Sequence, residues 1–233
     1  MSEPPLRSLS RVFLPGADLD NPFELPSNER DRLRKVLRLE SGDLVALLPN
    51  DGTLVVSRLD GRYAVPERRV TIDTEPARKL TLVQALPKGE KLEEIVRAGT
   101  EIGVSRFIVF PSERSVVRWD ANKIEGKLDR LSLILKESAE LSFRARLPKL
   151  VWANSLDEVL KNVPDVAALS EFESVATPLT PVTNVEAIAV GPEGGWTARE
   201  HEKFKTHLTL GPRVLRTEHA GPAAAAILLL SSR

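Results

Sequence analysis

Short apolar runs that alternate with helical stretches constrain the fold of residues 78–233 more than any other feature. The continuous apolar segments at residues 107–110 and 187–190 are typical of strands that are buried on both faces. Residues 90–102 carry apolar side chains at helical spacing, and Gly103 follows them as a helix C-cap. Because strands and helices alternate along this segment, it predicts an α/β domain with a mostly parallel sheet.

The amino-terminal part of the chain follows a different pattern. Residues 44–48 and 54–59 are rich in apolar side chains and flank a Pro-Asn-Asp-Gly turn sequence, which predicts a β-hairpin. A short helix is expected to begin near Ser27. We therefore expect residues 1–74 to form a small β-barrel that carries one helix. A linker around Pro76 separates the two domains, because proline disfavours helix in the residue before it and donates no hydrogen bond to a sheet.

The composition excludes several classes of protein. The 233 residues include no cysteine and three histidines, so disulfides and thiolate metal ligands are excluded and we expect no metal site. No apolar run approaches the roughly 20 residues that span a bilayer, and the amino terminus lacks the basic and apolar regions of a signal peptide. We therefore expect a cytoplasmic protein with no membrane segment. Lysine plus arginine and aspartate plus glutamate both number 33, so net charge alone predicts no attraction to a polyanion.

Basic side chains nevertheless gather at residues 30–38, where Asp31 is the only acid. Such a charged stripe is more often a solvated helix face than a binding site. A role in phosphate binding therefore needs a second, independent indication. The stripe consists of Arg30, Arg32, Arg34, Lys35 and Arg38.

Three loops of the second domain are candidates for a ligand site. Ligands of open parallel sheets bind beyond the carboxyl ends of the strands, which places the loops after residues 169, 190 and 210 at the same edge. The loop after residue 190 contains three glycines, which permit close approach of the backbone to a ligand but are also common in ordinary turns. Its spacing matches neither the Walker phosphate loop nor the dinucleotide-binding fingerprint, so nucleotide hydrolysis and hydride transfer lose support.

The same loops carry a resemblance to a known family. Gly191-Pro192-Glu193-Gly194-Gly195, followed by Leu210-Gly211-x-Arg213-Val214-Leu215-Arg216-Thr217-Glu218, resembles the SPOUT RNA methyltransferases and most closely the RsmE family. Further blocks of that family follow one another along nearly the whole chain. They are Val36-Leu37-Arg38 with Gly42-Asp43, Thr100-Glu101-Ile102-Gly103-Val104, Ser112-Glu113-Arg114-Ser115 and Ala139-Glu140-x-Ser142-x-Arg144.

The resemblance implies a fold, a reaction and partners. It implies an amino-terminal PUA-like barrel that binds RNA, at residues 1–74, and a SPOUT domain with a trefoil knot, at residues 78–233. It also implies S-adenosyl-L-methionine as methyl donor, a homodimer, and a substrate in small-subunit ribosomal RNA, within an assembled 30S particle. The implied reaction is methylation of N3 of uridine 1498 in 16S ribosomal RNA.

With this reaction in view, the residues divide into three predicted sets. Glu193 or Glu218 can accept the N3 proton, directly or through water. Arg144 or Arg216 can stabilise the uracil anion or hold phosphate, and the sequence does not choose among these candidates. Thr217 or Glu218 can also simply cap the last helix. RNA phosphates are assigned to the basic stripe with Arg11 and Arg114. The cofactor is assigned to Leu169, Ser170, Glu171, Gly191, Pro192, Gly194, Gly195, Leu210, Gly211, Val214, Leu215 and Thr217.

Three positions depart from the family pattern and keep alternatives open. His219 stands where threonine is usual, Leu141 stands where glutamine is usual, and Arg32 often has histidine as its counterpart. One alternative is a methyltransferase that acts on another RNA base, since fold alone does not fix the substrate. The other is a ribosome-assembly protein that binds the cofactor without turnover.

Overall fold

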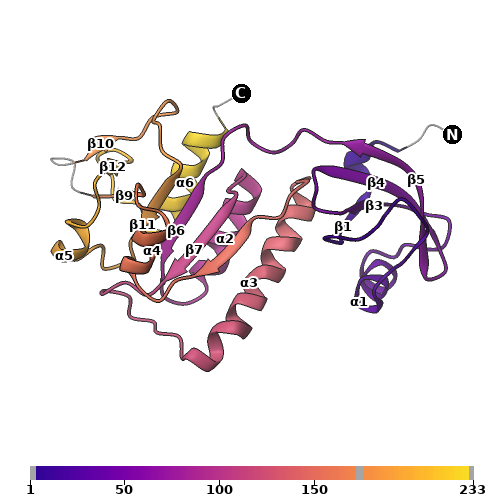
Figure 1. The fold of residues 1–233 in the computed structure, drawn as a ribbon, viewed down its shortest axis with the longest axis horizontal. Coiled ribbons are helices and arrows are strands. Elements are labelled where there is room, and N and C mark those ends of the chain that lie inside the picture. The colour runs from indigo at the N-terminus through magenta and orange to yellow at the C-terminus, as the bar shows by residue number, and fades with distance from the viewer. Residues whose placement is uncertain (1–3, 172–175, 231–233) are drawn as a thin grey trace. The chain divides into compact units, whose positions relative to one another are not determined.

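The computed structural model describes residues 4–171 and 176–230 and divides into two compact units (Figure 1). The first unit consists of Met1–Glu75 together with Ala139–Leu147. The second unit consists of Pro76–Ser138 together with Pro148–Arg233. The short segment 139–147 therefore folds with the amino-terminal part of the chain, although it lies far from that part in the sequence.

A five-stranded sheet forms the first unit, in the order β1-β3-β4-β5-β2. β1 (Ser10–Phe13) pairs in parallel with β3 (Leu44–Leu48), and the other neighbours are antiparallel. β3 and β4 (Thr53–Asp60) form the hairpin that the sequence predicted. The remaining strands are β2 (Phe23–Glu24) and β5 (Tyr63–Thr71).

The basic stripe of the first unit begins on a short α-helix and continues on a π-helical turn. α1 (Ser27–Asp31) starts where the sequence predicted and is followed by η2 (Arg32–Val36). π-Helical turns are rare and often occur at functional sites. Arg38, just after this turn, has a φ of 57°, which is uncommon for a residue other than glycine. A single 3-10 turn, η1 (Leu6–Ser8), precedes β1.

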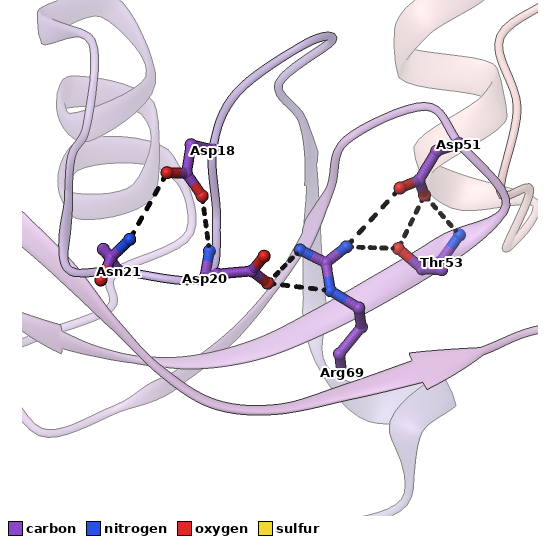
Figure 2. A network of polar contacts seen from close by, with 6 residues as sticks. All are labelled: Asp18, Asp20, Asn21, Asp51, Thr53 and Arg69. Atoms are coloured by element: carbon purple, nitrogen blue, oxygen red, sulfur yellow. Dashed lines mark hydrogen bonds and ion pairs between the residues drawn. The ribbon is translucent and has the colours of Figure 1, made fainter.

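Apolar side chains cover both faces of the five-stranded sheet. Successive residues of a strand point to opposite faces, so Val12 packs with Leu33 and Val45, whereas Phe13 packs in a second cluster with Ala139 and Phe143. Those two residues of the segment 139–147 are thus part of the core of the first unit. The first unit also contains a polar network in which Arg69 forms ion pairs with both Asp20 and Asp51 (Figure 2).

The second unit contains a seven-stranded sheet in the order β10-β12-β9-β11-β6-β7-β8, and every paired strand is parallel. This confirms the α/β fold with a parallel sheet. β8, β10 and the helix that follows β8 were not predicted. The strands are β6 (Thr81–Ala85), β7 (Arg106–Phe110), β8 (Lys149–Trp152), β9 (Ala167–Leu169), β10 (Thr177–Pro178), β11 (Ala187–Val190) and β12 (His207–Thr209).

Five helices accompany this sheet within the described residues. α2 (Lys91–Ile102) ends at Gly103, whose φ of 112° is the left-handed conformation expected of its C-cap. α5 (Ala198–His201) begins with a capping box formed by Thr197 and Glu200. The apolar α6 (Thr217–Leu229) packs against α2, β6 and β11. The others are α3 (Ala121–Leu141) and α4 (Leu156–Asn162).

Candidate functional site

A cavity of about 620 Å³ lies in the second unit, beyond the carboxyl ends of β9, β11 and β12. These strands are neighbours in the order β12-β9-β11, so the loops that follow them meet at one edge of the sheet. Every residue that the sequence analysis assigned to the cofactor lines this cavity. The lining residues to which the sequence analysis gave no role are Lys91, Val190, Trp196, His201, Thr209, Arg213 and Ala220.

The glycine-rich loop after β11 forms one wall of the cavity. A Cβ at Gly194 would lie 3.3 Å from the Arg114 side chain, and Gly195 has a φ of 66°, so both positions favour glycine. The indole Nε1 of Trp196 donates a hydrogen bond to the carbonyl of Leu169 at 3.1 Å. Trp196 also packs against Phe204, with ring centroids 5.0 Å apart. The indole therefore joins the loop after β11 to the end of β9.

The first turn of α6 is tied to the same loop. The Thr217 hydroxyl donates a hydrogen bond to the carbonyl of Gly191 at 2.7 Å and accepts one from Gln84 Nε2 at 3.1 Å. Gln84 is fully buried on β6. The Thr217 side chain thus holds the cavity wall together, while its backbone lies at the start of a helix, where N–H groups are available to a ligand.

Two carboxylates and one ammonium group form an ion-pair cluster at the cavity. Lys91 Nζ lies 3.0 Å from Glu193 Oε1 and 3.2 Å from Glu218 Oε2. Burial disfavours the charged form of both glutamates, but hydrogen bonds from backbone N–H groups and the nearby ammonium of Lys91 outweigh it, so the pKa of each is below its ordinary value. The pKa of Lys91 is raised, chiefly by its hydrogen bond to Glu193. All three groups are therefore charged at neutral pH.

Two arginines lie at the same cavity. Arg114 Nη1 donates a hydrogen bond to the carbonyl of Gly194 at 2.9 Å. The Arg216 side chain is 80% exposed, and its Nη1 lies 4.0 Å from Glu218 Oε1. Arg216 thus combines a place on the cavity lining with an exposed guanidinium.

Arg144, predicted as a catalytic candidate, belongs to the first unit and does not line the cavity. It is 4% exposed, and its guanidinium donates to Glu75, with Nη2 2.6 Å from Oε2. The backbone N–H groups of Ala145 and Arg146 also donate to Glu75. This carboxylate therefore holds the turn after α3.

The arginines predicted to bind RNA phosphates differ in their contacts. Arg32 lies 2.7 Å from the buried carboxylate of Glu140, and Arg11 donates to the Glu140 carbonyl. The exposed Lys35 pairs with Asp31 at 2.9 Å. The structure gives no ion pair or hydrogen bond to the side chains of Arg30, Arg34 and Arg38 within its described residues, and the last two are exposed.

The two unusual residues near the predicted site lie outside the cavity lining. His219 is exposed on α6, and Leu141 is 76% exposed at the end of α3.

Across residues 4–171 and 176–230, no group of three or more potential ligands that could hold a metal ion is present. In the same ranges, no helix is both long and apolar enough to cross a membrane.

Comparison with known proteins adds a second line of information. A family model described as "RNA methyltransferase domain" matches residues 74–229. The ribosomal RNA small subunit methyltransferase E of Bacillus subtilis is 31% identical over 223 residues, which cover 85% of this chain and 86% of that protein.

Two solved structures are similar over nearly their whole length. A Legionella pneumophila protein in complex with bound S-adenosylmethionine is 26% identical, with a TM-score of 0.87 and coverage of 96% of this chain and 98% of that one. A ribosomal RNA small subunit methyltransferase E from Neisseria gonorrhoeae, also bound to S-adenosylmethionine, is 26% identical, with a TM-score of 0.81 and coverage of 94% and 95%.

Proposed function

Because the chain belongs to the family of ribosomal RNA small subunit methyltransferase E, we propose that it methylates N3 of one uridine, uridine 1498, in 16S ribosomal RNA. S-adenosylmethionine, when bound, supplies a methyl group carried on a positively charged sulfur. The observation that carries this proposal is the cavity between the loops after β9, β11 and β12.

The cavity fits this cofactor in size and in chemistry. Its volume of about 620 Å³ is in the usual range for small-molecule sites, roughly 300–1,000 Å³. The glycines after β11 leave the backbone accessible, and the start of α6 offers N–H groups to polar parts of a ligand. Leu169, Leu210 and Leu215 provide apolar lining for an adenine ring. Two similar proteins bind S-adenosylmethionine, which supports the assignment.

The chain's acidic residues would handle the uracil proton, since N3 must lose its proton before it can accept a methyl group. Glu193 lines the cavity, and Lys91 forms an ion pair with both Glu193 and Glu218. Both are ionised at neutral pH and can accept a proton directly or through water, although their low pKa values make them weak bases. The exposed Arg216 would stabilise the uracil anion or hold a phosphate.

A catalytic role for Arg144 stays a prediction. Its burial and its bidentate contact with Glu75 support a structural role within the first unit. Arg216 is therefore the arginine that this proposal uses.

The first unit, in this proposal, is a PUA-like RNA-binding barrel. Its curled five-stranded sheet and its basic stripe support that assignment. Arg30, Arg34 and Arg38 are the stripe residues best placed to contact phosphates, because the structure gives their side chains no ion pair or hydrogen bond within the described residues. Arg114 would contact RNA at the cavity itself.

The proposal includes a trefoil knot in residues 78–233 and a homodimer that acts in the cytoplasm on an assembled 30S particle. β11 lies between β6 and β9, which both precede it in the chain, and this insertion of a later strand supports a threaded topology. The apolar side chains of Val214 and Leu230 are 71% and 65% exposed, which supports contact between the second unit and another protein surface in the homodimer.

The test is incubation of the protein with labelled S-adenosylmethionine and small ribosomal subunits that lack the modification, followed by mapping of the RNA by mass spectrometry. We expect one methyl group on N3 of uridine 1498. Methyl on another base would contradict the proposed substrate, and cofactor binding without any methyl transfer would contradict the proposed enzyme activity. Naked 16S RNA in a parallel reaction tests the requirement for an assembled particle.

A further inference from the structure

Lys91 occupies an unusual position for a lysine. It is the first residue of α2, where the positive end of the helix dipole disfavours a cation. It lines the cavity, although no motif in the sequence marks it. A cation at this end of a helix therefore needs compensating negative charge nearby.

That charge comes from two different elements. Glu193 lies in the loop after β11 and Glu218 in the first turn of α6, and Lys91 Nζ is within 3.2 Å of a carboxylate oxygen of each. Glu193 Oε1 also accepts a hydrogen bond from the backbone N–H of Lys88 at 3.0 Å. The Glu218 side chain is 7% exposed, so its charge is poorly solvated without a partner.

The balance of charge makes Lys91 necessary for this arrangement. Two carboxylates that share a site without a cation repel each other, and this repulsion raises the pKa of one of them. Besides Lys91, Glu218 has two basic neighbours among the described residues, Arg216, at 4.0 Å, and His219 on the same helix. Both of these side chains are exposed, whereas the Lys91 side chain is 29% exposed and bridges the two glutamates.

We propose that Lys91 is a positioning residue for methyl transfer, whose ammonium group holds Glu193 and Glu218 together at the cavity wall as two ionised carboxylates. This inference rests on the proposed function, because it assigns the two glutamates to handling of the uracil proton. With Lys91 in place, one carboxylate is available to take the N3 proton while the ammonium offsets the charge of the other.

The experiment compares Lys91→Met, Lys91→Arg and a matched control, Lys203→Met. Lys203 is also partly exposed and paired with a carboxylate, Asp157 at 2.6 Å, but it does not line the cavity. The first measurement is an NMR titration of the Glu193 and Glu218 carboxyl groups, which needs no substrate. The second is the dependence of kcat on pH with whichever RNA product the wild type forms, together with KM for RNA and Kd for S-adenosylmethionine.

Lys91→Met is expected to raise the pKa of one glutamate by about one unit or more, and to move the acid limb of the kcat profile upward by a similar amount. At neutral pH both carboxylates stay ionised after a shift of this size, so the loss of activity there comes from their displacement: kcat falls about tenfold or more, whereas KM and the cofactor Kd change less than about threefold. Lys91→Arg restores the acid limb, since the charge is retained, and Lys203→Met leaves the titration and kcat unchanged.

Three results would overturn the inference. One is a Lys91→Met protein whose carboxyl titration is unchanged, and another is a shifted titration with an unchanged acid limb. The third is a cofactor Kd weakened as much as kcat, which would make Lys91 a binding residue. If the wild type forms no N3-methyluridine, the proposed function fails, but the titration still decides whether Lys91 holds the two carboxylates.

Discussion

The two units use ion-paired carboxylates in opposite ways. In the first unit, Glu75 accepts hydrogen bonds from the Arg144 guanidinium and from two backbone N–H groups, all of them within that unit. In the second unit, Glu193 and Glu218 share the ammonium of Lys91 beside an open cavity. The first arrangement completes the hydrogen bonding of a turn, and the second leaves an excess negative charge at a place that a ligand can reach.

This comparison shows that residue type alone does not identify a functional charge. Arg32 and Arg144 have the sequence features of ligand-binding arginines, yet each faces a carboxylate inside its own unit. Lys91 had no such feature and lines the cavity. The partner and the exposure of a charged group therefore show which contacts the folded chain already makes, and its position in a motif does not.

The largest effect is expected from Arg144→Met, which removes the cation from the Glu75 site. Breaking one side of a buried ion pair costs about 3 kcal/mol, so we expect a decrease of that size in the free energy of unfolding of the first unit. The measurement is urea denaturation followed by circular dichroism. Lys205→Met is the control, because its pair with Asp165 is exposed and should contribute less than about 1 kcal/mol. Unchanged stability with a loss of methyl transfer would instead favour a catalytic Arg144.

The second largest effect is expected from Gly195→Val, which changes the wall of the cavity. A β-branched residue at a φ of 66° is strained, and we expect the affinity for S-adenosylmethionine to fall at least about tenfold, or about 1.4 kcal/mol. Isothermal titration calorimetry gives the Kd. Gly61→Val has the same kind of strain, at a φ of 57°, but lies in the first unit and does not line the cavity. Equal decreases of cofactor affinity in both variants would mean that strain rather than the cavity causes the effect.

A smaller effect is expected from the exposed arginines of the stripe. Arg34→Ala and Arg38→Ala should each weaken RNA binding by about 1 kcal/mol and reduce the slope of log K against log salt by about 0.7 to 0.9 for each phosphate that the variant no longer neutralises. Arg32→Ala should leave the slope unchanged and lower stability, since it removes the ion pair with Glu140. Fluorescence anisotropy over a range of salt concentrations distinguishes the two behaviours. Cofactor affinity should stay the same in all three variants.

The smallest effect is expected in the acid stability of the second unit. Because the folded state lowers the pKa of Glu193 and Glu218, their contribution to stability is present above the ordinary value of 4.5 and is lost as the pH falls through the lower folded values. Lys91→Met should therefore make the free energy of unfolding depend less steeply on pH below 4.5 than in Lys203→Met. Unfolding curves at about pH 3 to 6 provide the comparison, and parallel pH dependences in both variants would contradict it.

Local patterns predicted much of the second unit. The buried-strand runs that became β7 and β11 and the helix C-cap at Gly103 depend on neighbours within a few residues, and the structure confirms each of them. The β3–β4 hairpin was predictable for the same reason. β8 was missed because it starts with a lysine and is only partly buried, so it lacks the continuous apolar run of the equally short β11. The helix α4 was missed because its seven residues are too few for a clear helical periodicity.

Spacing along the chain was enough to predict the α/β alternation and the β3–β4 hairpin, since each of these depends on residues that are close in sequence. The meeting of distant groups, in contrast, emerged only from the folded chain. Folding brought residues 139–147 into the first unit, turned Arg32 toward Glu140 and joined Lys91 to two glutamates more than 100 residues away. Such pairings depend on strand order and on burial, which fix the partner of a charged side chain through space, so no pattern of neighbouring residues encodes them.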